Sequence, residues 1–212
     1  MRDLSHPIEP GMPTYPGDPV VETWPDSTHG RDGCRVSAFG MGTHAGTHVD
    51  APNHVEPDGR ALDTYPADRF GGEAVVATVE AGRETTVTVD QLAAALAGSP
   101  GGSPDWLVVA TGWWTHWGTD RYWNHPHLTP EAARWCADRG FDVAIDTPSV
   151  DPMGGHLASH HELFSAERLV VENLTNLDGL GPRVGFGAYP LALTGADGAP
   201  VRAVADPDAP TV

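Results

Sequence analysis

Cysteine is scarce in this chain, and its scarcity excludes two kinds of site. The 212 residues include only Cys34 and Cys136. They are too few to crosslink a disulfide-rich secreted scaffold and too far apart in sequence for a CxxC motif. Any metal site must therefore be built from histidine and carboxylate ligands.

Long apolar runs are also missing. No stretch approaches the roughly 18 apolar residues that a membrane-spanning helix needs. The first residues, MRDLSHPIEPGMP, lack the apolar segment of a secretory signal. We therefore expect a cytoplasmic protein without a membrane partner.

Basic residues are outnumbered as well. The chain has 12 Lys and Arg residues against 29 Asp and Glu residues, which gives a formal net charge of -17. A field of this sign repels phosphate backbones and argues against a nucleic-acid partner. It also attracts cations, although an acidic surface commonly serves solubility alone.

Apolar core material and turn residues, in contrast, are plentiful. Hydrophobic residues make up 40% of the chain, which is enough for a packed core, and the length fits a single domain over residues 1–212. The 25 glycines and 20 prolines are spread along the chain and predict many turns between short elements. The proline-rich sequence SHPIEPGMPTYPGDP predicts that residues 1–33 form an extended arm that packs on the domain.

Several short runs have the composition of strands. Five of them, bounded by turn residues, are typical of buried strands: residues 73–80, 105–112, 141–149, 168–174 and 187–195. A sixth run, CRVSAFGM, over residues 34–41, can form a strand that ends close to a histidine-rich segment.

Two helices are predicted from their start signals. Thr88 stands three residues before Gln91, as in a capping box, and Thr129 with Pro130 fits the first positions of the second helix. On that helix Cys136 shares a face with alanines, so we expect a core thiol. Few helices among many strands predict an α+β fold in one domain, with a mixed sheet of short strands around a barrel-like core and few flanking helices.

The histidine-rich segment is HAGTHVDAPNH, residues 44–54. In an extended chain His44, His48 and Asp50 lie on one face, and Gly46 leaves room for the two rings to converge. Two imidazoles and a carboxylate without a thiolate suit a catalytic divalent ion, with zinc first and manganese or iron(II) as alternatives. A bare HxxxH can also belong to a surface loop that binds nothing, but the aspartate and the following PNH favour a metal site.

The longer pattern HxGTHxDxPxH resembles the signature of the cyclase family of metal-dependent hydrolases, which includes kynurenine formamidases and isatin hydrolases. DLSHPIEPGMPTYPGDP resembles the family's N-terminal segment, IDTPSVDP its central strand and turn, and SHHELFSAERLVVENL its second metal segment. The resemblance extends over nearly the whole chain. It implies a swivelling β/β/α fold, and it implies a homodimer or homotetramer.

The resemblance also implies a set of metal ligands. Carried over residue by residue, it assigns His44, His48 and Asp50 as the first ligands. His160 and Glu172 match the ligands that complete a site for one or two ions. In the two-zinc members the equivalents of Asp50 and Glu172 help to hold both ions.

Two residues in this resemblance have alternative assignments. His160 and His161 are adjacent, and the spacing to Glu172 favours His160 as the ligand. By its position in the motif, His54 matches the family's general acid/base histidine. This role is chemically reasonable, because an imidazole that titrates near pH 6.5 can take a proton from water and return it to a leaving amine. The alternative for His54 is a fourth ligand or a loop cap.

Aromatic side chains are the candidates for the wall of a substrate pocket. Tyr15 lies where kynurenine formamidases carry a substrate-contacting tryptophan, so it can stack on a planar substrate or simply pack. The run TGWWTHWGTDRYWNHPHL, residues 111–128, is rich in tryptophan. We expect Trp113 and Trp114 to line the pocket, in a run that also contributes to a subunit interface.

These features predict an enzyme, a metal-dependent hydrolase that cleaves an amide, formamide or lactam in a small aromatic or cyclic substrate. The ion lowers the pKa of its bound water and polarises the carbonyl, while His54 moves the proton. One alternative is a cyclase or lyase that acts on a secondary metabolite and uses the ion to stabilise an enolate. The other alternative is a metal-binding interaction module without activity.

Overall fold

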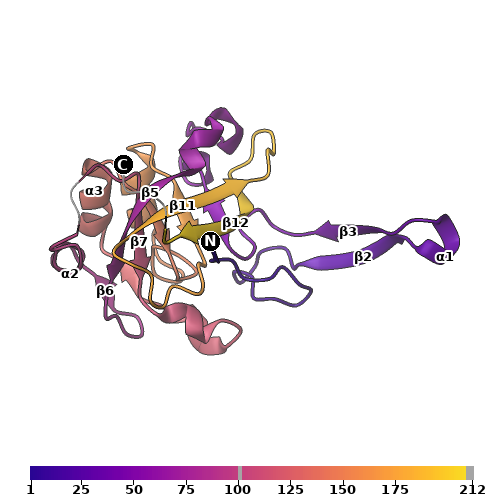
Figure 1. Ribbon diagram of the computed structural model, residues 1–212, viewed down its shortest axis with the longest axis horizontal. Coiled ribbons are helices and arrows are strands. Elements are labelled where there is room, and N and C mark those ends of the chain that lie inside the picture. Colours follow the sequence, from indigo (N-terminus) through magenta and orange to yellow (C-terminus); the bar gives the residue numbers. More distant parts are fainter. Residues whose placement is uncertain (100–101, 209–212) are drawn as a thin grey trace.

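Seven short strands close into a barrel in the computed structural model of the chain, which describes residues 1–99 and 102–208 (Figure 1). Around the ring the order is β12, β11, β5, β7, β9, β10 and β4, and β4 pairs with β12 to close it. The neighbours β5, β7, β9 and β10 run parallel, and the other pairs are antiparallel. The bounds are β4 (His48–Asp50), β5 (Gly71–Thr78), β7 (Trp106–Ala110), β9 (Asp142–Ile145), β10 (Val170–Glu172), β11 (Arg183–Pro190) and β12 (Gly198–Asp206).

Further short elements complete the described part of the fold. The remaining strands are β1 (Arg2–Asp3), which pairs with β12, β2 (Glu22–Ser27) paired with β3 (Val36–Gly40), and β6 (Thr86–Val87) paired with β8 (His127–Leu128). The α-helices are α1 (His29–Asp32), α2 (Val89–Ala95), α3 (Pro130–Asp138) and α4 (Ala158–Phe164). The 3₁₀ helices are η1 (Pro52–His54), η2 (Leu62–Thr64), η3 (Ala67–Phe70), η4 (Trp113–His116) and η5 (Asp120–Trp123). Across residues 1–99 and 102–208, no helix has both the length and the apolar character that crossing a bilayer demands.

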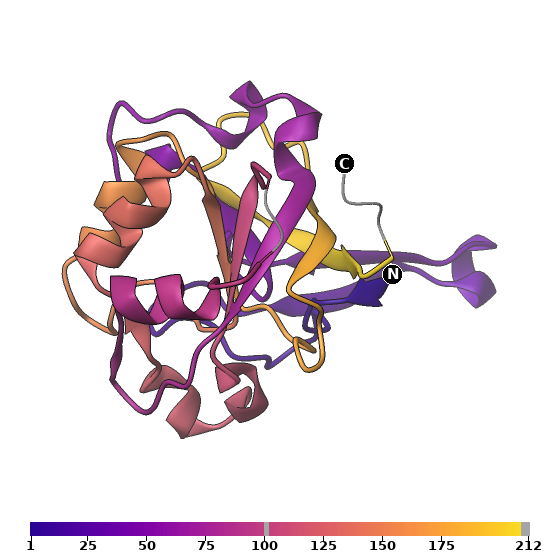
Figure 2. The ribbon, with the colours of Figure 1, turned by 60° about the vertical axis from the view of Figure 1, so that its left-hand side comes forward.

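The alternation of side chains along the barrel strands builds two cores. On β7, Trp106 and Val108 belong to the cluster inside the barrel, whereas Leu107 and Val109 belong to the cluster outside it, and all four are fully buried. The outer cluster includes residues of α2, α3 and α4, and these helices cover one side of the barrel (Figure 2). The closed mixed sheet with few helices beside it is the α+β architecture that the sequence predicts.

Both predicted helix starts are confirmed. Thr88 Oγ1 accepts a hydrogen bond from the Gln91 backbone, and the Gln91 side chain accepts one from the Thr88 backbone, so a capping box opens α2. Thr129 Oγ1 accepts a hydrogen bond from the Ala132 backbone at the start of α3. Cys136 on α3 is fully buried, and this burial raises the pKa of its thiol to about 12.

Most of the expected strands are present. The runs expected as strands at residues 34–41, 105–112, 141–149 and 168–174 contain β3, β7, β9 and β10, and the run 73–80 overlaps β5, which begins two residues earlier. The run 187–195 is only partly a strand, because β11 begins earlier and ends at Pro190. Leu191 and Leu193 beyond it are exposed and irregular. In the sequence, exposed leucines cannot be told from buried ones, so the apolar run extended the predicted strand beyond its actual end.

Two elements that position the candidate site have weak sequence signals, and neither is predicted from the sequence. β12 contains Pro200, a residue that disfavours the interior of a sheet. In the structure Pro200 lies opposite His48 in the short pairing that closes the barrel. α4 has the sequence ASHHELF, is only seven residues long and has no side-chain cap at its start.

The proline-rich segment over residues 1–33 is divided in the structure. Its first part follows the barrel, with Leu4, Met12 and Val21 buried. The second part does not pack on the barrel: from Glu22 the chain forms the hairpin β2–α1–β3, which projects outward (Figure 1). Pairing with β3 satisfies the backbone groups along one edge of β2, and both strands are largely exposed.

Candidate functional site

Two neighbouring barrel strands bring three of the candidate ligands together. β4 and β10 pair antiparallel with His48 opposite Glu172, and Asp50 lies two residues further along β4 on the same face. The Nε2 atom of His48 lies 3.2 Å from Asp50 Oδ1 and 3.6 Å from Glu172 Oε2. All three side chains are buried. The register of the two strands therefore fixes their mutual placement.

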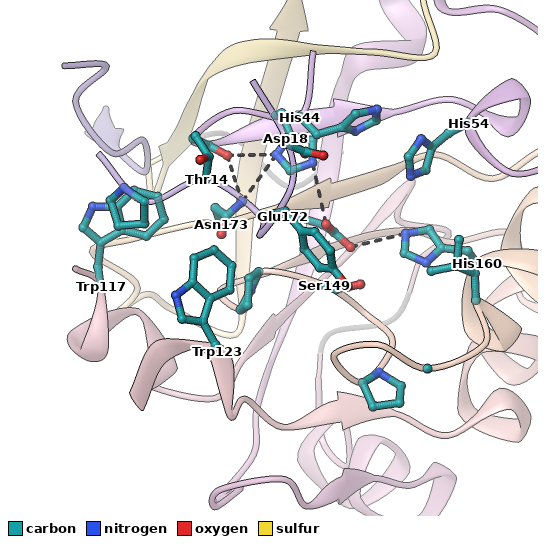
Figure 3. Close-up of a pocket in the computed structure, with 18 residues that line it drawn as sticks. Thr14, Asp18, His44, His54, Trp117, Trp123, Ser149, His160, Glu172 and Asn173 are labelled. Atoms are coloured by element: carbon teal, nitrogen blue, oxygen red, sulfur yellow. Dashed lines mark hydrogen bonds and ion pairs between the residues drawn. The ribbon is translucent and has the colours of Figure 1, made fainter. Parts of the chain in front are cut away.

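A fourth candidate comes from α4. His160 is buried on this helix, and its Nε2 atom lies 3.3 Å from Glu172 Oε1 and 3.8 Å from Asp50 Oδ2 (Figure 3). His161 is exposed instead, and its Nδ1 atom lies 2.6 Å from Glu56 Oε1. The structure therefore brings His160, and not His161, to the cluster.

His44 reaches the cluster from a turn rather than from an extended strand. Its Nδ1 atom lies 2.6 Å from Asp50 Oδ1. Gly46 has a φ of 67°, so the extended conformation expected for this segment begins only at His48. A Cβ atom at Gly46 would lie 2.9 Å from the end of the Met12 side chain. Glycine is therefore needed for the backbone conformation and for this close packing, and not to leave space between two rings as predicted.

In two of the imidazoles, those of His48 and His160, a hydrogen bond fixes the Nδ1 atom. His160 Nδ1 donates to Asp151 Oδ2 at 2.7 Å, and His48 Nδ1 donates to the carbonyl of Gly46 at 2.8 Å. The Nε2 atoms of both rings are buried and have no hydrogen-bond partner among the described residues. An imidazole fixed at one nitrogen, with the other nitrogen bare and facing carboxylates, is typical of a metal ligand.

The carboxylates of this cluster stabilise positive charge on the groups beside them. Burial opposes the ionisation of Asp50, but the charges of His48 and His44 outweigh it and hold the pKa of Asp50 well below its usual range. Burial also opposes a charge on His160, whereas the hydrogen bond to Asp151 and the nearby carboxylates of Asp50 and Glu172 raise the pKa of this imidazole well above its usual range. An arrangement that stabilises a proton here stabilises a metal cation at the same place.

The donor set fits one or two divalent ions. Two groups of donor atoms share Asp50, and within each group the atoms lie within 4.8 Å of one another. The first group is His44, His48 and Asp50, and the second is Asp50, His160 and Glu172. Imidazole nitrogen and carboxylate oxygen without thiolate are suitable ligands for zinc or manganese.

His54, on η1, stands beside the cluster. The centre of its ring lies 4.0 Å from that of His44 and 6.0 Å from that of His160. Its Nδ1 atom lies 3.6 Å from Asp197 Oδ2. Burial is the main cause that lowers the pKa of His54, so its imidazole is neutral at pH 7 and can accept a proton.

A cavity of about 330 Å³, the site cavity, opens beside these residues. Its wall includes the aromatic side chains of Tyr15, Trp117 and Trp123 (Figure 3). The rings of Tyr15 and Trp123 are nearly perpendicular, with their centres 6.3 Å apart. This size and this mixture of apolar walls with a few polar groups are typical of small-molecule sites. Tyr15 is therefore placed where it can contact a substrate.

Trp113 and Trp114 do not line the site cavity, and the prediction that they do was wrong. Trp113 is buried, and its Nε1 atom donates to the carbonyl of Tyr122. Trp114 borders a separate depression on the surface. The tryptophan-rich run folds into the two short helices η4 and η5, so its tryptophans point in different directions. Trp117 and Trp123 of the same run face the site cavity instead.

Three polar residues at the site were missed by the sequence predictions. Asp151 fixes His160, and Asp197 accepts a hydrogen bond from His44 Nε2 at 3.0 Å. Asn173 donates to a backbone carbonyl in the turn before β4 at 2.9 Å. Asp151 and Asn173 have a signal that could have revealed them, because they stand in the family-like segments IDTPSVDP and SHHELFSAERLVVENL, whereas Asp197 has none.

Fold and site together define the class of this protein, a barrel enzyme with a histidine and carboxylate centre beside a small-molecule cavity. A family model described as "Putative cyclase" matches residues 2–152. The kynurenine formamidase of Paracidovorax citrulli (strain AAC00-1) is 35% identical over 209 residues, which cover 95% of this chain and 94% of that protein. The chain therefore belongs to the putative cyclase family.

Solved structures agree with this assignment. Isatin hydrolase A from Labrenzia aggregata superposes with a TM-score of 0.86 at 26% sequence identity, covering 96% of this chain and 91% of that one. A potential metal-dependent hydrolase with cyclase activity superposes with a TM-score of 0.79, also at 26% identity, covering 96% of this chain and 95% of that one. The similarity thus extends over nearly the full length of all these chains.

Replacing Asp151 by Asn tests the support behind His160. The change keeps the size of the side chain and removes the negative charge that strengthens the imidazole as a ligand. We expect the affinity for zinc to fall roughly 10–100-fold, measured by competition with a chromogenic chelator. Glu56→Gln, which alters the carboxylate that pairs with the exposed His161, is the matched control and keeps the wild-type affinity. Wild-type affinity in Asp151→Asn would contradict this role.

Proposed function

We propose that this protein is a metal-dependent hydrolase that cleaves an amide, formamide or lactam bond in a small aromatic or cyclic substrate. The observation that carries the proposal is the pair of buried, bare Nε2 atoms on His48 and His160, which face shared carboxylates beside the site cavity. The relatives support the reaction class, since kynurenine formamidase and isatin hydrolase act on carbon–nitrogen bonds other than peptide bonds.

The proposed cofactor is zinc, as one or two ions, with manganese as the alternative. The proposed ligands are His44, His48, Asp50, His160 and Glu172. When bound, the ion supplies a water of lowered pKa and a Lewis acid for the substrate carbonyl. Asp50 belongs to both of these donor groups, so it would help to hold an ion at either position.

His54 is the proposed general acid and base. Its neutral imidazole takes a proton from the attacking water and returns it to the leaving nitrogen. The Asp197 carboxylate near Nδ1 favours the tautomer with its hydrogen on that atom, which leaves Nε2 as the proton acceptor. The ring lines the site cavity and lies within 6.0 Å of the His160 ring, so the proton has a short path to the reacting atoms.

The aromatic wall is proposed to position the substrate. Tyr15, Trp117 and Trp123 contribute three aromatic side chains to the wall of the site cavity, and a cavity of about 330 Å³ suits one or two fused rings. Trp117 is itself held by a stacked imidazole, since the His6 ring lies parallel to it with the centres 3.8 Å apart. A planar substrate can therefore be held with its acyl group toward the ligand cluster.

A metal-dependent cyclase or lyase that acts on a secondary metabolite is the second candidate. The cyclase activity in the description of one structural relative favours it. Such an enzyme would use the same ion to stabilise an enolate instead of activating water. A metal-binding module without activity is less well supported, because structural metal sites are commonly closed shells whereas this cluster borders a cavity.

A homodimer or homotetramer in the cytoplasm is also proposed. The hairpin β2–α1–β3 exposes Trp24, Val36 and Phe39, and an isolated two-stranded sheet is marginally stable in water. A second copy that covers these side chains would stabilise the hairpin. Cys34 is unpaired and exposed, which suits a reducing compartment.

Replacing His54 by Ala tests the proton-transfer role. We expect kcat for formanilide hydrolysis to fall by roughly 10²–10⁴-fold while the zinc content, measured by elemental analysis, stays at the wild-type value. His161→Ala removes an exposed imidazole that pairs with Glu56 and serves as the control with wild-type kcat. Undiminished turnover in zinc-loaded His54→Ala would remove His54 from the mechanism.

Reaction in ¹⁸O-labelled water separates hydrolysis from cyclisation or elimination. A hydrolase transfers one oxygen from water to the acyl carbon, so the label is expected in the carboxylate product, detected by mass spectrometry. The unlabelled carboxylate incubated with enzyme in the same water controls for exchange. Product formed without label would favour the cyclase or lyase.

Replacing Phe39 by Asp tests the proposed interface. The new charge disfavours burial of the hairpin, so we expect the variant to be a monomer by size-exclusion chromatography with light scattering. Leu193→Asp introduces the same charge at an exposed leucine outside the hairpin and keeps the wild-type mass. A monomeric wild-type protein would refute the proposed oligomer.

A further inference from the structure

A third group of donor atoms, the outer group, lies beside the ligand cluster. It consists of His44, His54 and Asp197, whose donor atoms also lie within 4.8 Å of one another. The Oδ2 atom of Asp197 lies 3.0 Å from His44 Nε2 and 3.6 Å from His54 Nδ1. Two ligands of a tetrahedral zinc ion, with bonds of about 2 Å, are roughly 3.3 Å apart. Both separations are therefore close to those around a bound ion.

The fold holds Asp197 in this position through contacts with its side chain and its backbone. Thr43 Oγ1 donates to Asp197 Oδ1 at 3.1 Å, and the Ala51 backbone donates to the Asp197 carbonyl at 2.9 Å. The next residue is Gly198, where a Cβ atom would lie 2.8 Å from Cε1 of His44. The imidazole therefore packs against the backbone next to Asp197, with its Nε2 atom facing the carboxylate.

The outer group is open to solvent, unlike the ligand cluster. The side chain of Asp197 is 41% exposed and that of His54 is 29% exposed, whereas that of Asp50 is 1% exposed. A cation can therefore reach the outer group without passing through the ligand cluster. The net charge of -17 also concentrates cations around the protein.

His44 has two nitrogens that face different carboxylates. Nδ1 lies 2.6 Å from Asp50 Oδ1, and Nε2 lies 3.0 Å from Asp197 Oδ2. A neutral imidazole has only one bare nitrogen, so His44 supplies a ligand to one group at a time. When it binds an ion through Nε2, it donates the hydrogen on Nδ1 to Asp50. The other four proposed ligands then remain in the ligand cluster.

We propose that the outer group is an inhibitory site for an additional zinc ion. The ion binds His54 Nδ1, Asp197 and, when its Nε2 atom is bare, His44. Binding at Nδ1 moves the ring hydrogen of His54 to Nε2, so this nitrogen no longer accepts a proton from the attacking water. The inhibition rests on the proposed hydrolase function, whereas binding of the ion to the outer group does not.

Activity in zinc-buffered solutions tests the inhibition. We expect formanilide hydrolysis by the wild-type protein to rise as the ligand cluster fills and to fall again at higher free zinc. In Asp197→Asn the zinc concentration for half-inhibition is expected to rise more than about tenfold, because even a residue that only orients a ligand contributes roughly 10–100-fold to metal affinity. Each protein is compared with its own maximal rate, so a lower turnover of the variant does not affect this value.

Two controls separate the outer group from zinc bound elsewhere on the surface. Glu56→Gln removes the carboxylate that lies 2.6 Å from the exposed His161, and this variant is expected to keep the wild-type inhibition. Magnesium prefers oxygen ligands in an octahedral shell, so it should not inhibit the zinc-loaded wild type. Equal zinc inhibition of Asp197→Asn and the wild type, or no fall in wild-type activity as free zinc rises, would overturn the proposal.

Anomalous diffraction tests the outer group without turnover. Crystals of the zinc-loaded wild-type protein that are soaked in additional zinc should show an extra peak between His54 and Asp197. Soaked crystals of His54→Ala should lack this peak. If formanilide is not hydrolysed, the proposed function is contradicted, while the peak still decides whether the outer group binds zinc. Soaked wild-type crystals without a peak at the outer group would overturn the proposal.

Discussion

Buried carboxylates that require a cation beside them are the constraint on which the rest of this structure depends. Asp50 and Glu172 are removed from solvent at the point where β4 and β10 pair, next to the bare Nε2 atoms of His48 and His160. Leaving such charges without compensation costs several kcal/mol. The divalent ion that we propose would supply a compensating charge, which would link binding of the ion to stability of the fold.

The architecture around this cluster follows from the same need. Closure of the barrel by β4 and β12 removes unpaired backbone groups beside the ligands, and α4 carries His160 in from the outside of the sheet. Asp151 and the carbonyl of Gly46 hold the rings from behind, so their orientation is set before an ion arrives. Beside this buried cluster, the site cavity has a more exposed wall that includes Tyr15.

The sequence predicted the parts of this site that are local in the chain or resemble a known pattern. The spacing of His44, His48 and Asp50 predicted a group of possible metal donors, and the structure brings these side chains together, although a positive φ at Gly46 replaces the expected extended run. The tryptophan-rich run was assigned incorrectly, because the pattern of a short 3₁₀ helix does not tell which ring faces a cavity. Asp197 is near His44 and His54 only through tertiary folding, so nothing in its neighbourhood in the sequence indicated it.

Anomalous diffraction from crystals of the zinc-loaded protein, recorded at the zinc absorption edge, tests the central claim most directly. The account predicts one or two zinc peaks within coordination distance of Asp50, with the Nε2 atoms of His48 and His160 turned toward them. His44, His54 and Asp197 form another group of possible donors, and the map distinguishes zinc bound there from zinc bound at Asp50. Zinc bound only at that outer group, or no zinc within reach of Asp50, would contradict the account.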